Sequence, residues 1–395
     1  WAIERTRMKL TLIYPKWPRL SRQTEFHLPP HGPVVFAAAL PDEIEVTFID
    51  ENVQPIDFDA PTDLVGLSVM LTLQVKRAWE IADAYRRRGV KVVCGGIATM
   101  LHAEETAAHA DAVFIGEAEG RMQEVIDDFR RGRLKKIYNY LDALPPIESV
   151  GPARRDLLAK GLYNYRGIQM VDLVHASRGC QYNCYPCAVA YLGGRKFRPR
   201  PIDRAIAEMA GIENNRLFIV DNSLAQDTQW EMDLFREMIP LKKKWGGLAT
   251  TKITSDPELF DLLVRSGCGF LLIGFESISQ RSLNKIHKGF NARESYDEVV
   301  RRLREWSGTP VLVLSVRDAT DQKVAALEAE DRSGRHAGAC PRFARGQRSA
   351  TEWVPQEPTC DCLASSAICV HSVFVELADV VLHDHVAGIG KDRPA

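Results

Sequence analysis

Hydrophobic and polar positions follow two regular patterns over the first 140 residues. Short apolar runs indicate strands, and each gives way to a stretch with the three-to-four-residue apolar spacing of an amphipathic helix. The run at 63–70 is apolar enough to be buried on both faces, as in a parallel sheet. The predicted strands cover residues 9–14, 45–50, 63–70, 91–94 and 111–116, and the predicted helices cover 74–88, 103–109 and 117–131.

This alternation of strand and helix predicts an α/β fold. Successive βαβ units with right-handed crossovers give a doubly wound, Rossmann-like sheet, here assigned to a domain over residues 8–140. In such a sheet, ligands bind at the carboxyl ends of the strands. Residues 141–168, which contain Pro145-Pro146, Gly151-Pro152 and Gly161, are predicted to form a linker.

A second series of strands and helices begins after the linker. Strict βα alternation over residues 169–316 predicts a (β/α) barrel or part of one, and the series ends too early for a complete barrel. The predicted strands cover 171–177, 217–222, 247–253, 269–277 and 310–316, and the predicted helices cover 202–212, 229–243, 293–305 and a helix starting at 257.

The last part of the chain, residues 317–395, has neither a helical nor a strand period. We expect an irregular tail in which only the apolar segment 365–381 forms one short element. A truncated or frameshifted reading frame and a disordered extension would each explain this composition.

Composition and charge argue against three classes of protein: nucleic-acid-binding, membrane-spanning and exported proteins. The chain has 395 residues, 45% of them hydrophobic, and a net charge of -1, so no overall basic field attracts nucleic acid. It has no apolar run of about 18 residues, which predicts no membrane span. The first residues lack the apolar core of a signal peptide, so a cytoplasmic location is expected. The arginine runs 86–88 and 130–131 are expected on solvated helix faces.

Three of the nine cysteines carry the chemistry. Cys180, Cys184 and Cys187 form a C-x3-C-x2-C segment directly after the predicted strand 171–177. Thiolates select zinc, copper(I) or iron–sulfur centres. A structural zinc site needs four ligands, and no fourth Cys or His lies in this segment. Three thiolates fit a [4Fe–4S] cluster with one iron open to substrate, while a zinc knuckle and three unconnected thiols remain alternatives.

The cysteine spacing, placed after the first barrel strand, resembles the radical S-adenosylmethionine superfamily. The resemblance implies that the open iron binds the methionine moiety of S-adenosylmethionine. An external low-potential donor such as flavodoxin or ferredoxin would supply an electron, which releases a 5′-deoxyadenosyl radical. Members usually have an aromatic residue before the third cysteine. Here that residue is Pro186, and we expect Tyr185, with Tyr182 close by, at the adenine.

Two strand-end motifs extend the resemblance. The segments 217–223 and 273–277 resemble the second-strand and fourth-strand motifs of the superfamily. They imply that the cofactor is contacted by Asp221, Asn222, Glu276 and Ser277. A strand-terminal cap or an ion pair to a barrel helix is the alternative role for Asp221 and Glu276.

The segment 195–201 (RKFRPRP) resembles an arginine-rich stretch of the cobalamin-linked branch of the superfamily. A solvated loop is the alternative interpretation for its arginines, Arg195, Arg198 and Arg200.

Residues 8–140 resemble the cobalamin-binding domain that precedes many of these barrels. A glycine pair at a strand end allows close backbone approach to a bulky ligand. The resemblance implies that the cobalamin edge is formed by Ser68, Thr72, Gly95, Gly96, Gly116 and Glu117. No D-x-H-x-x-G motif is present, and His31 lies outside such a context, so we expect no protein histidine on cobalt.

These features predict a radical enzyme that carries out cobalamin-assisted methyl transfer or cyclisation on a small molecule. The first alternative is a radical enzyme with a vestigial cobalamin domain, for example in methylthiolation. Methylthiolating relatives carry three further cysteines in the N-terminal domain, where this chain has only Cys94. The second alternative is a non-catalytic iron–sulfur or corrinoid-binding protein. The residues do not identify the substrate.

Overall fold

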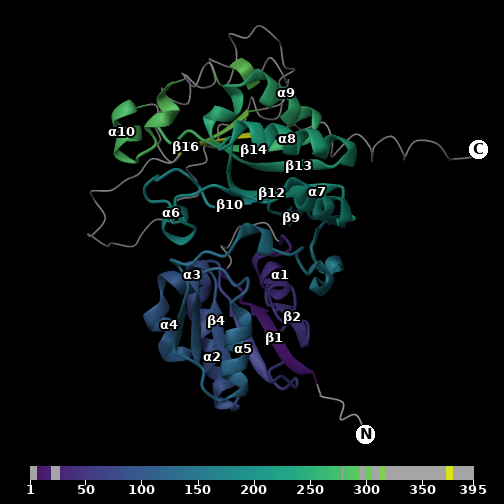
Figure 1. Ribbon diagram of the computed structural model, residues 1–395, viewed down its shortest axis with the longest axis vertical. Coiled ribbons are helices and arrows are strands. Elements are labelled where there is room, and N and C mark those ends of the chain that lie inside the picture. Colours follow the sequence, from purple (N-terminus) through teal and green to yellow (C-terminus); the bar gives the residue numbers. More distant parts are fainter. Residues whose placement is uncertain are drawn as a thin grey trace, which may run out of the picture. The chain divides into compact units, whose positions relative to one another are not determined.

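The computed structural model of the chain describes residues 7–18, 27–277, 279–293, 299, 301–303, 311–315 and 371–376 (Figure 1). It divides into two compact units. Unit 1 comprises Trp1–Gln181 and Ala188–Val220, and unit 2 comprises Tyr182–Cys187 and Asp221–Ala395. The division passes through one strand, β12 (Arg216–Leu224). Each unit is described by itself.

The first sheet of unit 1 has six strands in the order β2-β1-β3-β4-β5-β6, and neighbouring strands pair in parallel. This arrangement confirms the predicted doubly wound α/β fold. The reversal of strand order next to β1 is the position at which such sheets bind ligands. The strands are β1 (Met8–Tyr14), β2 (Ile44–Asp50), β3 (Leu64–Ser68), β4 (Lys91–Gly95), β5 (Ala112–Ile115) and β6 (Ile137–Asn139).

Side chains alternate between the two faces of this sheet. Leu10, Leu12 and Tyr14 pack with helices α1 (His31–Ala38) and α5 (Met122–Arg130), whereas Ile13 packs with α2 (Val75–Arg87) on the other face. Each buried leucine or isoleucine contributes about 1.5–3 kcal/mol, so helices are held on both faces. Two further helices, α3 (Ile97–Leu101) and α4 (Ala103–His109), follow β4.

The rest of unit 1 contains short elements. β9 (Asp172–Val174) pairs in parallel with the first part of β12, and β10 (Ser177–Arg178) pairs antiparallel with β11 (Arg198–Pro199). A small hairpin joins β7 (Asn164–Tyr165) to β8 (Ile168–Gln169). The helices are α6 (Val189–Leu192), α7 (Ile202–Gly211) and the 3-10 turns η1 (Thr72–Gln74), η2 (Ile147–Ser149), η3 (Arg155–Leu157) and η4 (Lys160–Leu162). The boundaries proposed for the domains and the linker stay predictions.

Unit 2 holds strands in the order β15-β16-β14-β13. β13 (Lys244–Ala249) and β14 (Cys268–Gly274) are parallel, whereas β16 (His371–Glu376) is antiparallel to both β14 and β15 (Val311–Ser315). The helices are α8 (Thr228–Met238), η5 (Ile239–Leu241), η6 (Thr251–Thr254), α9 (Pro257–Arg265), α10 (Gln280–Lys285) and η7 (Gly289–Arg293).

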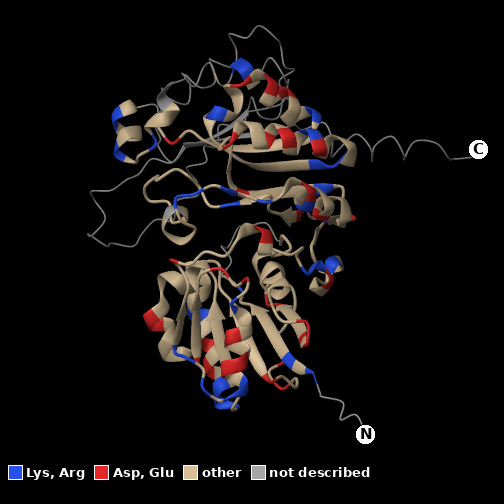
Figure 2. Cartoon of the chain, viewed as in Figure 1, with Lys and Arg blue, Asp and Glu red and all other residues tan. Residues whose placement is uncertain are grey.

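The C-terminal segment contains the one short element predicted for it, a strand. β16 falls within the apolar segment 365–381, and its antiparallel pairing adds a strand that a βα barrel series does not contain. The remainder of 317–395, and most of the predicted helix 293–305, lie outside the described residues. Lys, Arg, Asp and Glu are interspersed along the described elements (Figure 2). No helix in the described part of the chain has the length and hydropathy of a membrane span.

Candidate functional site

The loop that carries the three cysteines, residues 179–197, is closed at its base by β10 and β11. Arg178 lies directly opposite Arg198 in this two-residue ladder, and Ser177 lies opposite Pro199. Gly179 follows with a φ of 77°. A Cβ atom there would lie 2.1 Å from the carbonyl oxygen of Lys196, so the closed loop requires glycine.

The loop cysteines differ from the other described cysteines in their surroundings. Cys180 and Cys184 are half-buried and Cys187 is exposed. Cys94 and Cys268 lie in the cores, where burial raises the pKa of each thiol to about 12. Because thiolates are the metal-binding form, the loop cysteines are the ones among these five described cysteines that are chemically suited to hold a metal.

The described residues contain no group of three His, Cys, Asp or Glu side chains that could hold a metal ion. Cys180 belongs to unit 1, whereas Cys184 and Cys187 belong to unit 2, where the N–H of Cys187 donates to the carbonyl of Cys184 at 2.9 Å. The assignment of the three cysteines as ligands therefore remains a prediction that rests on their spacing and exposure.

The middle of the cysteine loop is held by the segment after α10. The N–H of Tyr185 donates to the carbonyl of Ile286 at 2.9 Å, and Nδ1 of His287 lies 3.1 Å from the carbonyl oxygen of Asn183. The side chain of Tyr185 is left 61% exposed. It is therefore accessible to a planar ligand, the role that the sequence predicted for it at adenine.

An aromatic stack adds to these bonds. The ring of Tyr182 stacks on Phe290 with centroids 4.2 Å apart, and Nζ of Lys252 lies 5.2 Å from the Tyr182 ring. Such stacking and cation–π contacts each contribute about 0.5–1.5 kcal/mol. The loop between the first two cysteines thus has a fixed side-chain anchor within unit 2.

The predicted methionine-moiety residues lie at strand ends in unit 2. Asp221 is buried on β12 and Asn222 beside it is exposed. After β14, Glu276 has a φ of 67° and its carboxylate accepts from Nζ of Lys288 at 2.7 Å. The hydroxyl of Ser277 accepts from the N–H of Ser279 at 3.1 Å. Glu276 therefore forms an ion pair, although Lys288 lies between α10 and η7 and not on a helix as the alternative role assumed, and its contact with S-adenosylmethionine stays a prediction.

A buried carboxyl supports the turn after β12. Glu231 accepts from the N–H groups of Ala225 at 2.7 Å and Gln226 at 3.0 Å. Burial raises the pKa of this carboxyl to about 7; the two hydrogen bonds lower the pKa in part, and the nearby charges of Asp221 and Asp227 add to the rise. The group fixes the strand end on which Asp221 lies.

The predicted cobalamin edge lies at the carboxyl ends of β3, β4 and β5. Ser68 ends β3 and is half-buried, and Thr72 begins η1 and is exposed. Gly95 ends β4, where an added Cβ would lie 3.7 Å from Phe114, an ordinary contact distance.

Gly96 and Gly116 have a different reason to be glycine. A Cβ at Gly96 would lie 2.5 Å from the carbonyl oxygen of Val69, and one at Gly116 would lie 3.0 Å from the carbonyl carbon of Tyr140. The close neighbour is the chain itself. We predicted that a ligand approaches closely at these two glycines. The contacts with the backbone of Val69 and Tyr140 explain why each position is glycine without invoking a ligand.

The same edge exposes an apolar surface. Met70 and Leu73 after β3 are 52% and 65% exposed, and Ile97 and Leu101 on α3 are 46% and 48% exposed. Clustered exposed apolar side chains mark ligand or interaction sites. A large apolar macrocycle such as a corrin ring would cover them, so the residues fit cobalamin.

Glu117, predicted at the cobalamin edge, is an ion-pair partner. Its carboxylate accepts from Arg178 at 2.8 Å and from both terminal nitrogens of Arg198, while Glu119 accepts from Arg178 at 2.7 Å. Arg200 is buried and pairs with Glu208 at 2.8 Å. The solvated-loop interpretation therefore holds for exposed Arg195 but is wrong for Arg198 and Arg200.

Sequence reasoning missed a histidine pair in which His175 is buried and His31 is half-buried. Nε2 of His31 lies 2.7 Å from Nδ1 of His175, between α1 and the segment after β9. Burial, together with the charges of nearby arginines, lowers the pKa of His31 to about 3 and that of His175 well below its usual value. The pair is therefore neutral at physiological pH.

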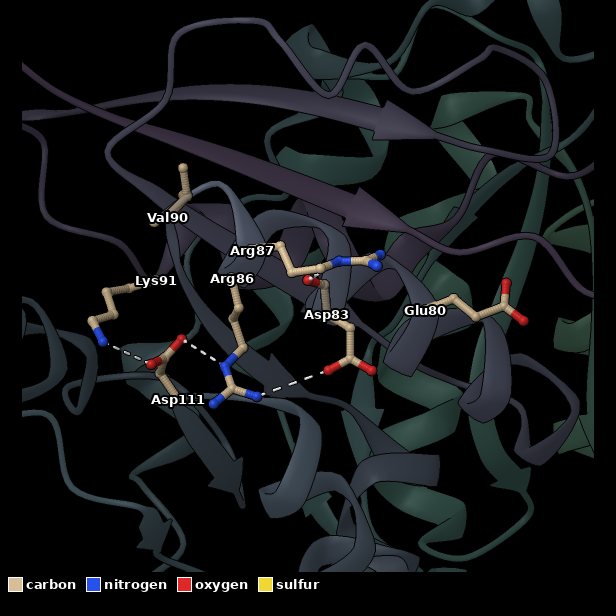
Figure 3. A pocket seen from close by; sticks show the side chains of 8 residues that line it. Glu80, Asp83, Arg86, Arg87, Val90, Lys91 and Asp111 are labelled. Atoms are coloured by element: carbon tan, nitrogen blue, oxygen red, sulfur yellow. Dashed lines mark hydrogen bonds and ion pairs between the residues drawn. The ribbon is translucent and has the colours of Figure 1, made fainter.

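A surface pocket lies at the opposite edge of the first sheet (Figure 3). Its charged residues pair with one another: Asp111 accepts from Lys91 at 2.9 Å and lies 3.5 Å from Arg86, which is 3.8 Å from Asp83. It is built from the end of α2 and the start of β4, away from the strand ends at which ligands bind. We do not assign it to the candidate site.

Two family models match the chain: the B12 binding domain over residues 20–126 and the Radical SAM superfamily over residues 174–317. Bacteriochlorophyllide d C-8(2)-methyltransferase of Chlorobaculum tepidum is 30% identical over 289 residues, which are 69% of this chain and 63% of that protein. The C-12(1)-methyltransferase of the same organism is 28% identical over 319 residues, 77% of this chain and 68% of that protein. The chain thus spans less than two thirds of the first relative.

Two solved structures share the fold. The cobalamin-dependent S-adenosylmethionine radical enzyme OxsB, with aqua-cobalamin and S-adenosylmethionine bound, has a TM-score of 0.62 at 18% identity and covers 75% of this chain and 47% of its own. The radical S-adenosylmethionine methyltransferase TsrM of Kitasatospora setae, with cobalamin and a [4Fe–4S] cluster bound, has a TM-score of 0.57 at 20% identity and covers 76% and 68%.

The two matched domains imply a [4Fe–4S] cluster, S-adenosylmethionine and cobalamin as cofactors, which confirms the cofactors predicted from the sequence. Carrying a B12-binding domain followed by a radical S-adenosylmethionine domain, the chain belongs to the cobalamin-binding branch of the radical S-adenosylmethionine enzymes.

Proposed function

We propose that this protein is a cobalamin-dependent radical S-adenosylmethionine methyltransferase that acts on a small molecule. The observation that carries the proposal is the contrast among its described cysteines: three lie half-buried or exposed on one loop after the first strand of the second series, while Cys94 and Cys268 are buried thiols. Methyl transfer is favoured over cyclisation because the relatives at 28–30% identity are named as methyltransferases.

Cys180, Cys184 and Cys187 would hold the cluster through three thiolates. When bound, the cluster supplies the electron that cleaves S-adenosylmethionine, and cobalamin supplies the methyl-transfer chemistry. Tyr185 would pack against adenine through its exposed ring. The methionine moiety would lie at the strand ends that carry Asp221, Asn222, Glu276 and Ser277.

The apolar surface after β3 and β4 would bind one face of cobalamin. Ser68, Thr72 and Gly95 lie at the same strand ends and would face its edge.

An external low-potential protein, such as flavodoxin or ferredoxin, would deliver the electron in the cytoplasm. Methylthiolation is less well supported. A second cluster in unit 1 would need cysteine ligands in the B12-binding region, and Cys94 there is fully buried with its thiol pKa raised to about 12.

Anaerobic turnover tests the proposal. The chain is reconstituted with iron, sulfide and cobalamin and is given S-adenosylmethionine with and without a low-potential reductant. We expect 5′-deoxyadenosine only with reductant, and S-adenosylhomocysteine with a methylated product when an acceptor is present. A chlorophyllide-type tetrapyrrole is the first acceptor to test, because two relatives are named for such substrates. Stoichiometric zinc without iron, or no reductant-dependent product, would refute the proposal.

A further inference from the structure

Two arginines face each other at the base of the cysteine loop. Arg178 on β10 is directly opposite Arg198 on β11, and their side chains are only 18% and 14% exposed. Directly opposed residues in an antiparallel pair have Cβ atoms about 4.5–5.5 Å apart, and like charges at that separation destabilise the ladder. A ladder of two residues cannot tolerate this repulsion without a compensating charge.

Glu117 provides that compensation for both arginines. One of its oxygens accepts from Arg178 at 2.8 Å and from Arg198 at 3.2 Å, and the other accepts from Arg198. Glu119 takes the second terminal nitrogen of Arg178 at 2.7 Å. Two carboxylates therefore balance two guanidinium groups. The side chains of Glu117 and Glu119 are 17% and 7% exposed, so solvent screens the interaction weakly.

The backbone fixes the position of these carboxylates. Gly116, just before them, adopts a φ of 111° and packs against the backbone of Tyr140. Arg198 also donates to the carbonyl of Pro145 at 3.3 Å. The backbone therefore holds Glu117 and Glu119 in fixed positions after β5, and Arg178 and Arg198 form ion pairs with them there.

We propose that Glu117 and Glu119 are positioning residues of the cysteine loop, which neutralise Arg178 and Arg198 and so keep the base of the loop closed. Glu117 then acts on the loop rather than on cobalamin, although it lies at the strand ends where cobalamin is expected. The consequence for cluster binding rests on the proposed function, whereas closure of the loop does not.

Limited trypsin digestion of the metal-free, full-length chain tests closure directly. Arg195 and Lys196 are exposed cleavage sites inside the loop, so opening of its base makes them better substrates. We expect Glu117→Gln to raise the cleavage rate there roughly five- to thirtyfold, the factor that one or two kcal/mol represents. Glu43→Gln, which removes an exposed partner of Arg130, is the matched control and should leave the rate unchanged.

The double variant Glu117→Gln/Arg198→Gln separates repulsion from general damage. Removing one of the two facing charges should return the cleavage rate to that of the wild type. A Glu117→Gln rate equal to wild type would overturn the proposal, and so would a double variant cleaved at least as fast as the single one.

A second measurement uses the reconstituted protein. Iron release to a chelator should be faster in Glu117→Gln and normal in the double variant, while cobalamin affinity stays unchanged. Lower cobalamin affinity with normal iron release would overturn the proposal. If even the wild type binds no iron, the proposed function fails, and the trypsin rates still decide whether Glu117 closes the loop.

Discussion

Replacing Cys184 with alanine is expected to remove the bound iron and to abolish reductant-dependent 5′-deoxyadenosine formation. Two thiolates cannot retain a cluster that already has one iron without a protein ligand. The loss should exceed the roughly 10- to 100-fold effect of mutating groups that only support metal ligands. The backbone bond from the Cys187 N–H to the Cys184 carbonyl, 2.9 Å long, does not involve the thiol, so the loop should keep its local fold.

Cys94→Ala is the matched control. Cys94 is fully buried in unit 1, and its loss should cost about 1 kcal/mol of stability, typical of a core substitution, while iron content stays normal. Iron and acid-labile sulfide per chain, together with chromatographic quantitation of 5′-deoxyadenosine, measure both variants. Full iron content and normal turnover in Cys184→Ala would remove this cysteine from the ligand set.

Gly179→Ala should have the next largest effect, because it forces open the base of the cysteine loop. The added Cβ would lie 2.1 Å from the carbonyl oxygen of Lys196. Both atoms are attached to backbone, so no flexible side chain can move to relieve the clash. The φ of 77° adds a left-handed penalty of about 1–2 kcal/mol. We expect a lower unfolding temperature and a severe loss of iron retention after reconstitution.

Gly120→Ala separates the effect of the close backbone contact from the penalty of the left-handed φ. Gly120 has a φ of 70°, and a Cβ there meets no atom within 4 Å. It should therefore show only the left-handed penalty and retain its iron. Thermal unfolding and iron content measure both variants. Equal effects of the two substitutions on iron content would show that the close contact at Gly179 is unimportant.

Part of the fold could be predicted because burial leaves a local pattern. The apolar runs of the first sheet predicted its parallel strands, since each is covered by helices on both faces. Helix α1 was missed because Pro33, Val34, Val35 and Ala37 are all buried, which leaves no polar face to give a helical period.

The predicted bounds of strand β13 were wrong for a related reason. It begins at Lys244, three residues before the predicted start, and Gly246 and Gly247 weaken the strand signal. Residues 251–253, two of them β-branched, were assigned to the strand but belong to the 3-10 turn Thr251–Thr254. Its Thr251 hydroxyl lies 3.1 Å from the side-chain oxygen of Asn291, a tertiary contact that overrides local propensity.

The candidate site, like the fold, could be predicted from the sequence only where its pattern is local. The three cysteines were found because their spacing is local. The pairs Glu117–Arg178 and His31–His175 are separated by 61 and 144 residues, and only folding brings them together. Gly96 and Gly116 were recognised as positions of close approach, but the sequence could not tell that Val69 and Tyr140 are the approaching groups.

Electron paramagnetic resonance of the reduced, reconstituted protein, recorded with and without S-adenosylmethionine, tests the central claim most directly. A cluster held by Cys180, Cys184 and Cys187 has one iron without a protein ligand, so S-adenosylmethionine should change the spectrum on binding. A spectrum that does not respond to S-adenosylmethionine, or a protein that takes up zinc in place of iron, would contradict the account.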